Sequence, residues 1–311
     1  MDKSSRVYIA GHKGMVGSAI YRLLEKQGYK NLLGASRQEL DLTNQNAVAS
    51  FFSINRPDYV FIAAAKVGGI KANMSLPAEF LYENLMIQNN LINQSHIHKV
   101  KKVCFLGSNC VYPRDAQQPL KEEYLLTGPF EPTNEGYAIA KLAGLRLVQY
   151  YHQEYGLKGV NPMPCNLYGP NDDFDPSSSH VLSATVKRFV DAVDENLPEV
   201  VMWGTGKATR EFLHTDDLAR AVLLLMETYD SSEIINVGSG TEVSIKSLAT
   251  LVAKEAGYKG SIVWDTSKPD GMPRKFLDVS KLTALGFKQK ITLEQGVKQH
   301  IQYYRTRKPA S

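Results

Sequence analysis

Residues 6–17 of the chain read RVYIAGHKGMVG, an apolar run followed by three glycines spaced three apart. The apolar residues 6–10 predict a buried strand, and the amphipathic stretch 18–27 predicts a helix behind the glycines. Glycines permit a tight turn and a close approach of the backbone to a pyrophosphate. The N-terminus of the following helix stabilises the negative charge of that pyrophosphate. A glycine triplet alone often marks only a turn, but between a strand and a helix it predicts a dinucleotide-binding turn.

The strand–helix pattern repeats along the first half of the chain. Apolar runs at residues 31–36, 59–65 and 103–106 predict further strands, and apolar residues at helical spacing predict a helix over 77–98. Such alternation favours an α/β fold with a doubly wound, Rossmann-type parallel sheet covered on both faces. After about residue 166 the loops become longer and richer in proline, aspartate and serine, which indicates a change of architecture.

Two helices are also expected in the second half. One begins near His180, and another begins at residues 214–217, with Thr215 or Asp216 as its cap.

Composition limits the classes of protein that the chain can represent. The 311 residues, 43% of them hydrophobic, can bury a sizeable core, and the formal charge of +4 without a dense basic run argues against a nucleic-acid partner. No apolar stretch approaches the ~20 residues of a membrane helix, and no signal region opens the chain, so we expect a cytoplasmic protein without a membrane partner. Three cysteines with no zinc spacing favour free thiols and no metal: Cys104, Cys110 and Cys165.

The residues after the second expected strand bear on which dinucleotide binds. The chain reads Ala35-Ser36-Arg37 there and has no acidic residue until Glu39. A carboxylate at this place accepts from the ribose hydroxyls of NAD and would repel a 2′-phosphate. A guanidinium can bind that phosphate through paired donors. Arg37 therefore favours NADP(H), the alternative being an ordinary solvated arginine.

Tyr137 and Lys141 lie four residues apart in the segment 132–144, PTNEGYAIAKLAG, which Thr133 and Asn134 can cap as a helix. Side chains four apart share one helix face, so the phenol and the ammonium group meet. A free phenol titrates near ~10, and a neighbouring lysine brings its pKa closer to neutrality, where it can exchange protons. The lysine can also hold the ribose of a nicotinamide.

The segment 106–113, LGSNCVYP, follows the fourth expected strand. In extended backbone, residues two apart project to the same side, which would place the Ser108 hydroxyl and the Cys110 thiol in one space. The plainer alternative is a loop serine next to a small buried cysteine.

The glycine motif, Ser108 and the Tyr137–Lys141 pair together are similar to the extended short-chain dehydrogenase/reductase superfamily. From about residue 6 to about residue 300, narrower motifs resemble the GDP-L-fucose synthase family: AAAKVGGI at 63–70, LGSNCVYP at 106–113, NLYGP at 166–170 and KPDGMPRK at 268–275. Two residues depart from the family pattern. Gly136 stands where proline is expected, and Cys165 stands where threonine is usual.

The resemblance implies an activity and an organisation. The family reduces GDP-4-keto-6-deoxy-D-mannose with NADPH after inverting C3 and C5 through enol or enolate intermediates. It also implies a homodimer and two domains. We expect an NADP-binding domain over 1–167 with a returning segment at about 211–238, and a smaller α+β substrate domain over about 168–210 and 239–311.

The resemblance also assigns residues. The expected catalytic residues are Ser108 on the C4 oxygen, Tyr137 and Lys141 for reduction, Cys110 as a candidate base and His180 as the opposing acid. Expected to bind NADP(H) are Gly11, His12, Lys13, Gly14, Met15, Val16, Gly17, Arg37, Asp41, Leu42, Ala63, Ala64, Ala65, Leu106, Gly107, Lys141, Pro164, Cys165, Asn166, Leu167 and His180. Expected to bind the GDP-sugar are Ser108, Asn109, Arg188, Trp203, Arg210 and Asp270.

Two other classes share part of this pattern. Another nucleotide-sugar 4-epimerase or 4,6-dehydratase would keep the glycines and the tyrosine–lysine pair. A dehydratase typically carries an acidic residue beside the serine, where this chain has Asn109 and Cys110. A non-enzymatic NADP(H)-sensing module can dispense with Tyr137 and Lys141, which this chain retains.

Overall fold

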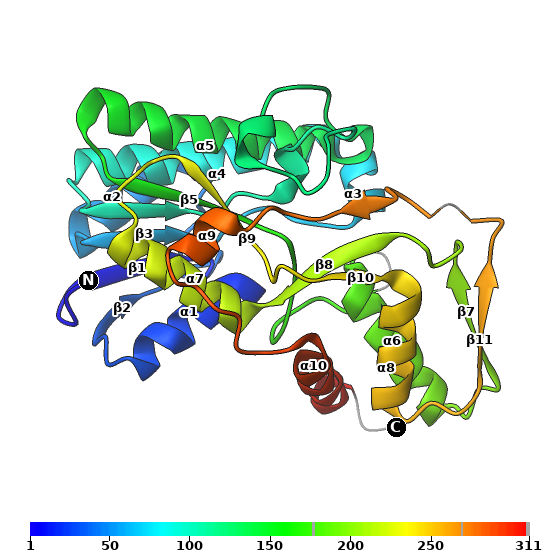
Figure 1. The fold of residues 1–311 in the computed structure, drawn as a ribbon. Coiled ribbons are helices and arrows are strands. Elements are labelled where there is room, and N and C mark those ends of the chain that lie inside the picture. The colour runs from blue at the N-terminus through cyan, green and yellow to red at the C-terminus, as the bar shows by residue number, and fades with distance from the viewer. Residues whose placement is uncertain (176–177, 269, 309–311) are drawn as a thin grey trace.

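The fold is that of a computed structural model, which describes residues 1–175, 178–268 and 270–308. Pro269 of the 268–275 motif therefore lies outside the described residues. Figure 1 shows a larger lobe with the N-terminus and the main sheet, and a smaller lobe with shorter sheets. Each lobe has its own cluster of buried apolar side chains.

The main sheet consists of six parallel strands in the order β2-β1-β3-β4-β5-β9. These strands are β1 (Arg6–Ala10), β2 (Asn31–Leu33), β3 (Tyr59–Ile62), β4 (Lys102–Phe105), β5 (Gly159–Pro164) and β9 (Ile234–Val237). The central strands are buried along almost their whole length, as parallel strands covered on both faces must be. The predicted doubly wound α/β fold is confirmed.

Helices cover both faces of this sheet (Figure 1). One face carries α2 (Gln45–Asn55), α4 (Pro77–Ile97) and α5 (Glu135–Tyr155), and the other carries α1 (Met15–Lys26) and α7 (Thr215–Thr228). Shorter turns of helix are α3 (Ile70–Ser75), α9 (Ser280–Ala284), η1 (Asn109–Val111), η2 (Glu122–Tyr124) and η3 (Pro132–Asn134). The long helix predicted over 77–98 is confirmed, and the helix predicted at 18–27 begins earlier, at Met15.

Two strands end before their predicted ends, and both endings shape the cofactor side of the sheet. β2 ends at Leu33, and at the next residue a Cβ on Gly34 would lie only 2.5 Å from the His12 ring, so this position has no room for a side chain. β3 stops at Ile62 because the next residues form the turn against which Gly11 packs.

The smaller lobe is built around β8 (Thr209–His214). β8 pairs with β6 (Asn166–Tyr168), β10 (Glu242–Ser244) and β12 (Arg274–Lys275), while β7 (Glu199–Trp203) pairs with β11 (Ser261–Asp265). The helices α6 (Val181–Asp194), α8 (Ile245–Ala256) and α10 (Leu293–Arg307) enclose the second core, in which Phe189, Val252 and Val297 are fully buried. The chain enters this lobe at β6, returns to the main sheet through α7 and β9, and enters it again at β10.

The helix starts in the second half differ from the prediction in one respect. α6 begins after His180 as expected. α7 begins at Thr215, and its cap is His214, whose Nδ1 accepts the N–H of Asp216 at 3.1 Å. The predicted caps, Thr215 and Asp216, are wrong because both residues already lie inside the helix.

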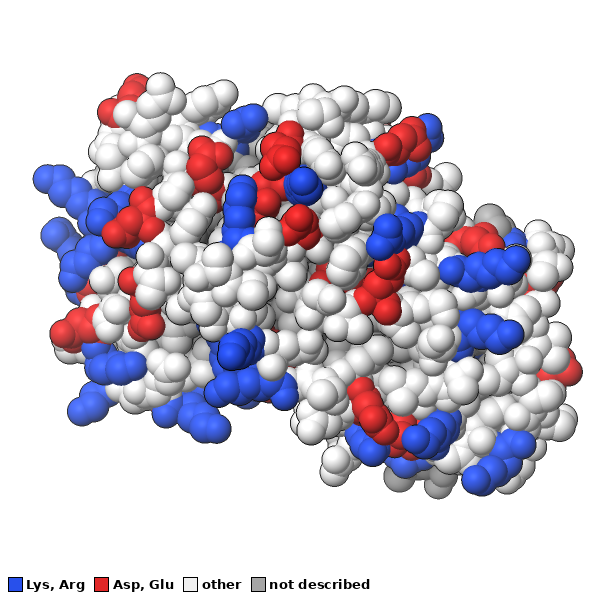
Figure 2. Space-filling model, in the orientation of Figure 1, with Lys and Arg blue, Asp and Glu red and all other residues white. Residues whose placement is uncertain are grey.

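The surface and the cysteines bear on the expectations drawn from composition. Among the residues that the structure describes, no helix is both long and apolar enough to cross a membrane. On the face drawn in Figure 2, lysines and arginines alternate with acidic residues over both lobes. The three cysteines are unpaired and buried, as the prediction of free thiols requires.

Candidate active site

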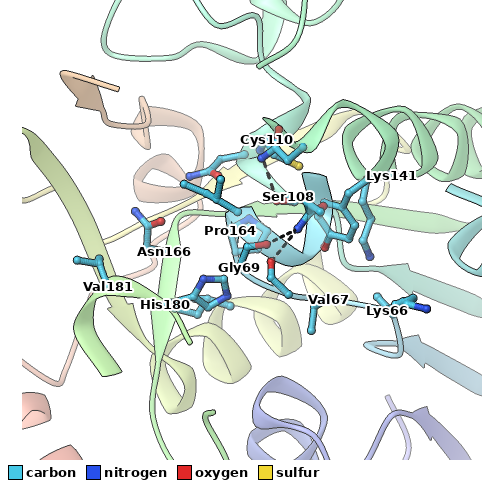
Figure 3. A pocket seen from close by; sticks show the side chains of 18 of the residues that line it. Lys66, Val67, Gly69, Ser108, Cys110, Lys141, Pro164, Asn166, His180 and Val181 are labelled. Atoms are coloured by element: carbon cyan, nitrogen blue, oxygen red, sulfur yellow. Dashed lines mark hydrogen bonds between the residues drawn. The ribbon is translucent and has the colours of Figure 1, made fainter. Parts of the chain in front are cut away.

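A cavity of about 1920 Å³ lies between the carboxyl ends of the main-sheet strands and the smaller lobe. Ligands of open α/β sheets bind at these ends, where the strand order reverses, which here is between β1 and β3. Figure 3 shows Ser108 and Cys110 on one wall of the cavity, with Lys141 beside them and His180 and Asn166 on another wall.

The glycine turn after β1 forms a cradle that side chains would fill. Gly11 has a φ of +84°, and a Cβ there would lie 2.8 Å from the Ala64 nitrogen. A Cβ on Gly17 would lie 2.1 Å from the Gly11 oxygen. α1 begins with Gly14 as its cap and without a side-chain cap, so the amide groups of its first turn are left for a ligand. A pyrophosphate fits this site by charge and by its acceptor oxygens.

The predicted cofactor residues line the cavity with two exceptions, His12 and Lys13. The His12 ring packs instead against the backbone of Gly34 and lies 6.2 Å from the Tyr21 ring, centroid to centroid. Both residues belong to the glycine turn, but neither is part of the lining.

Arg37 lies on the rim of the cavity, and its side chain is 82% exposed. Its guanidinium lies 3.6 Å from Glu83 on α4, a carboxylate that also accepts from Lys66 at 2.7 Å. Asp41 accepts the N–H and the hydroxyl of Thr43 at 2.9 and 2.8 Å, and these bonds lower the pKa of Asp41. Arg37 is thus an exposed cation at the place where a 2′-phosphate is expected.

Ser108 and Cys110 face the same part of the cavity, but the backbone is not the predicted extended one. β4 ends at Phe105, and Ser108 caps the short helix η1, accepting the Cys110 N–H at 3.4 Å (Figure 3). A single helical turn therefore brings hydroxyl and thiol together, rather than the alternation of a strand. Cys110 is only 6% exposed.

Lys275 faces Cys110 from the smaller lobe and was missed by the sequence analysis. Burial raises the pKa of the Cys110 thiol, whereas the charges of Lys275 and Lys141 lower it. Lys275 reaches this place because β12 pairs with β8 next to Arg210, while its neighbour Arg274 binds Glu242 at 2.7 Å. The only sequence signal was the motif 268–275, which assigned Lys275 no role.

Tyr137 and Lys141 share one face of α5 as predicted. The Lys141 ammonium donates to the Leu106 carbonyl at 2.8 Å and lies 5.8 Å from the centre of the Tyr137 ring. Burial lowers the pKa of Lys141 to about 8. Burial also raises the pKa of Tyr137, opposite to the expected direction, because desolvation of the phenolate outweighs the hydrogen bond from Ser108. The resting phenol is therefore protonated and able to donate.

The start of α5 explains one departure from the family pattern. A Cβ on Gly136 would lie 2.9 Å from the Pro77 oxygen, so this glycine permits the close approach of α5 to α4. Asn134 stands at the cap position, but its side chain makes no capping hydrogen bond, contrary to the prediction. The other departure, Cys165, is buried and donates to the Asn166 oxygen at 3.6 Å.

The wall formed by the smaller lobe carries the predicted substrate cations. His180 is exposed at the start of α6 and makes no side-chain cap. Arg188 donates to the Val201 oxygen at 2.5 Å, and Arg210 donates to the Thr209 oxygen at 2.7 Å. Arg188 also contacts the Met202 sulfur at 3.8 Å through the same nitrogen. A guanidinium has five N–H groups, so both arginines keep donors for a diphosphate.

Trp203 and Asp270 form the far end of the same wall. The Trp203 side chain is 64% exposed and offers a flat apolar surface. The Asp270 carboxylate accepts the N–H and the hydroxyl of Thr205 at 2.6 and 2.7 Å. These bonds tie Asp270, in the segment between β11 and β12, to the loop that follows Trp203 at the end of β7. Among the described residues, no three His, Cys, Asp or Glu side chains are arranged to hold a metal ion.

Comparison with known proteins identifies similar sequences and structures. Residues 7–238 match the model of the NAD dependent epimerase/dehydratase family. The chain is 52% identical to GDP-L-fucose synthase 1 of Arabidopsis thaliana over 303 residues, covering 97% of this chain and 94% of that protein. It is 50% identical to the GDP-L-fucose synthase of Escherichia coli over 308 residues, covering 96% of each.

The fold also matches solved structures. A GDP-mannoheptose C4 reductase from Campylobacter jejuni with NADP bound superposes with a TM-score of 0.91 at 40% identity. The match covers 98% of this chain and 99% of that structure.

Proposed function

The chain belongs to the GDP-L-fucose synthases within the NAD dependent epimerase/dehydratase family, and we propose which of its residues carry out each step of the reaction. It is an NADPH-dependent enzyme that converts GDP-4-keto-6-deoxy-D-mannose to GDP-L-fucose by epimerisation at C3 and C5 and reduction at C4. The observation that carries the residue assignment is one cavity lined by the glycine turn and by all five expected catalytic residues: Ser108, Cys110, Tyr137, Lys141 and His180.

The reduction is assigned to residues of the larger lobe. NADPH, when bound on the glycine turn, supplies the hydride that reaches C4 of the sugar. Ser108 holds the C4 oxygen, and Tyr137 gives it a proton as the hydride arrives. The protonated phenol, half-buried in the cavity wall, supports this role. Lys141 holds the nicotinamide ribose, and its positive charge stabilises the phenolate that remains.

The epimerisation is assigned to Cys110 and His180, which come from different lobes. The C4 ketone acidifies the hydrogens on C3 and C5, so each inversion needs one group to remove a proton and another to return it on the opposite face. We assign removal to Cys110, whose thiol lies beside Ser108 in the cavity; burial raises the pKa of this thiol, and the charges of Lys275 and Lys141 oppose that rise. We assign the return of the proton to His180, which is exposed to the same cavity.

The nucleotide is assigned to the wall of the smaller lobe. Arg188 and Arg210 bind the diphosphate through their free N–H groups. Trp203 stacks on a ring of the ligand, and the Asp270 carboxylate accepts its N–H groups. We propose two domains on this division, the larger for the cofactor and the smaller for the sugar nucleotide. Their boundaries differ from those expected from the sequence, because β6 and β8 pair in the smaller lobe, whereas Leu277 and Leu282 pack in the core of the larger one.

The assembly is proposed to be a homodimer formed through α4 and α5. These adjacent helices leave large apolar side chains exposed, with Tyr82 at 64%, Ile97 at 53%, Tyr150 at 57% and Tyr155 at 51%. Large exposed apolar side chains on adjacent helices favour association. Sedimentation velocity tests this: we expect a dimer, and a Tyr150→Glu variant that is monomeric. A parent protein that sediments as a monomer would contradict the proposal.

NADPH consumption tests the reaction directly. Purified protein is mixed with NADPH and GDP-4-keto-6-deoxy-D-mannose, and absorbance at the nicotinamide band is followed. We expect one NADPH oxidised per sugar converted. A 4-epimerase or 4,6-dehydratase would recycle its cofactor, and a sensing module would turn over neither compound, so either result would overturn the assignment.

A further inference from the structure

A buried polar cluster lies behind the start of α6, outside the lining of the active-site cavity. It consists of Asp172 from the loop after β6, Ser183 from the first turn of α6 and His300 from α10. The Ser183 hydroxyl donates to Asp172 and lies 2.9 Å from His300 Nε2. Ser183 is fully buried, His300 is 1% exposed, and the side chain of Asp172 is 5% exposed.

The hydrogen bonds of this cluster can be oriented from elementary chemistry. A hydroxyl has one proton, and Ser183 gives it to Asp172. His300 Nε2 must therefore carry the proton that it shares with the Ser183 oxygen. Burial lowers the pKa of His300 to about 3, so the ring is neutral, and its buried Nδ1 has no hydrogen-bond partner among the residues that the structure describes. His300 thus acts as a neutral N–H donor to Ser183.

The same loop is fastened to two other helices. Asn171 donates to Ser18 of α1 at 2.9 Å and accepts from Tyr303 of α10 at 2.8 Å. Phe174 stacks on the His300 ring with centroids 4.8 Å apart. The loop, α10 and the first turn of α6 are therefore one connected unit that also reaches the cofactor helix.

The three residues resemble a hydrolase triad only in composition. The carboxylate contacts the serine rather than the far nitrogen of the imidazole, and none of the three lines the cavity. The serine therefore cannot reach a substrate, and the cluster is not a nucleophilic site.

We propose that His300, acting through Ser183 and Asp172, is a positioning residue that fixes the start of α6 and thereby aims the imidazole of His180 into the active site. His180 lies three residues before Ser183, and its carbonyl accepts the Ala184 N–H at 2.9 Å. Its side chain makes no capping bond, so the backbone of this first turn sets its direction. The inference rests on the proposed role of His180 in proton return.

Two substitutions of His300 distinguish the effect of losing its hydrogen bond from the effect of changing its side-chain volume. His300→Leu removes the N–H donor, whereas His300→Gln keeps one that can reach the Ser183 oxygen. Inversion of the 4-keto sugar is followed by NMR in heavy water without NADPH. We expect His300→Leu to slow inversion by roughly tenfold or more, since misplacing a reacting group by a fraction of an ångström is costly. NADPH binding and reduction of a ketone already in the final configuration should remain at the parent level, and His300→Gln should invert close to the parent rate.

The matched control is Val252→Ala, which opens a cavity in the same core without touching the cluster. If His300→Leu lowers inversion, reduction and NADPH binding together, as a general loss of structure would, or leaves inversion unchanged, the proposal is overturned. If His300→Leu fails to fold, Ser183→Ala replaces it, and the same selective loss of inversion is expected. If His180→Asn inverts the sugar at the parent rate, the proposed role of His180 itself is overturned. If His180→Asn inverts the sugar slowly but His300→Leu inverts it at the parent rate, only the positioning role of His300 is overturned.

Discussion

The two lobes hold their reactive groups in different ways. In the larger lobe, Ser108, Tyr137 and Lys141 come from one core, and Lys141 is 4% exposed and bonded to the Leu106 carbonyl. In the smaller lobe, His180 is exposed at a helix start and depends on its backbone for direction. The groups that assist reduction thus keep their geometry within one packed unit, whereas inversion needs groups from both lobes. Inversion should accordingly be the more sensitive step to how the lobes are placed.

The largest effect is expected within the larger lobe, from Tyr137→Phe. The ring is retained, but the proton that must reach the C4 oxygen is lost. We expect reduction of a ketone already in the final configuration to slow by roughly 10²–10⁴-fold. NADPH binding, measured by fluorescence, should stay normal. A variant that reduces this ketone at the parent rate would show that the proton comes from elsewhere.

The next largest effect separates inversion from reduction. Cys110→Ser keeps the approximate size but replaces a thiol with an ordinary pKa near ~8.5 by a hydroxyl that does not ionise near neutrality. Deuterium incorporation at C3 and C5 should fall by about 10² or more without NADPH. Reduction of the ready-inverted ketone should continue. Exchange at the parent rate would mean that the cysteine is only a small buried residue.

Ser108→Ala is the matched comparison, because the serine serves both steps. Exchange and reduction should decline together, each by roughly tenfold or more, since both use the polarised carbonyl. NMR of deuterium incorporation and absorbance at the nicotinamide band measure the two rates. A loss confined to one of them would place Ser108 outside the shared step.

Cofactor selectivity probes the rim of the larger lobe. Arg37→Ala should weaken NADPH binding by about tenfold, because a charge-assisted hydrogen bond contributes roughly 1.5–3 kcal/mol. NADH, which lacks the 2′-phosphate, should bind nearly as before. The affinities of parent and variant for NADPH and NADH are measured by titration. Equal loss of affinity for the two cofactors would show that Arg37 does not bind the 2′-phosphate.

The smallest effect is a pH dependence of cofactor binding. Burial lowers the pKa of Lys141 to about 8, so its ammonium is charged below that pH and neutral above it. NADPH should bind about fivefold more weakly as the pH rises through 8, the difference between a charged and a neutral hydrogen bond. Lys141→Met should bind weakly at every pH and lack this change. A parent affinity that is constant from pH 7 to pH 9 would argue against contact between Lys141 and the ribose.

Features set by local sequence were predicted well. The strand, glycines and helix of residues 6–27 follow from neighbouring residues, as does the meeting of Tyr137 with Lys141 on one helix face. Ser108 and Cys110 lie together as predicted but on a different backbone, because a single 3-10 turn after β4 leaves no periodic signal in the sequence.

Features set by long-range packing were missed. Lys275 approaches Cys110 only because β12 pairs with β8, and no local pattern specifies that register. The raised pKa of Tyr137 depends on how deeply the phenol is buried, which spacing alone does not show. The His300 contact with Ser183 likewise joins residues far apart in the chain.

The most direct test of the difference between the lobes is His180→Asn, assayed in two ways on the same preparation. Inversion at C3 and C5 is followed by NMR in heavy water, and reduction is followed with a ketone already in the final configuration. The two-lobe account predicts that inversion falls by about 10² or more while reduction stays near the parent rate. Equal loss of both, or normal inversion, would contradict it.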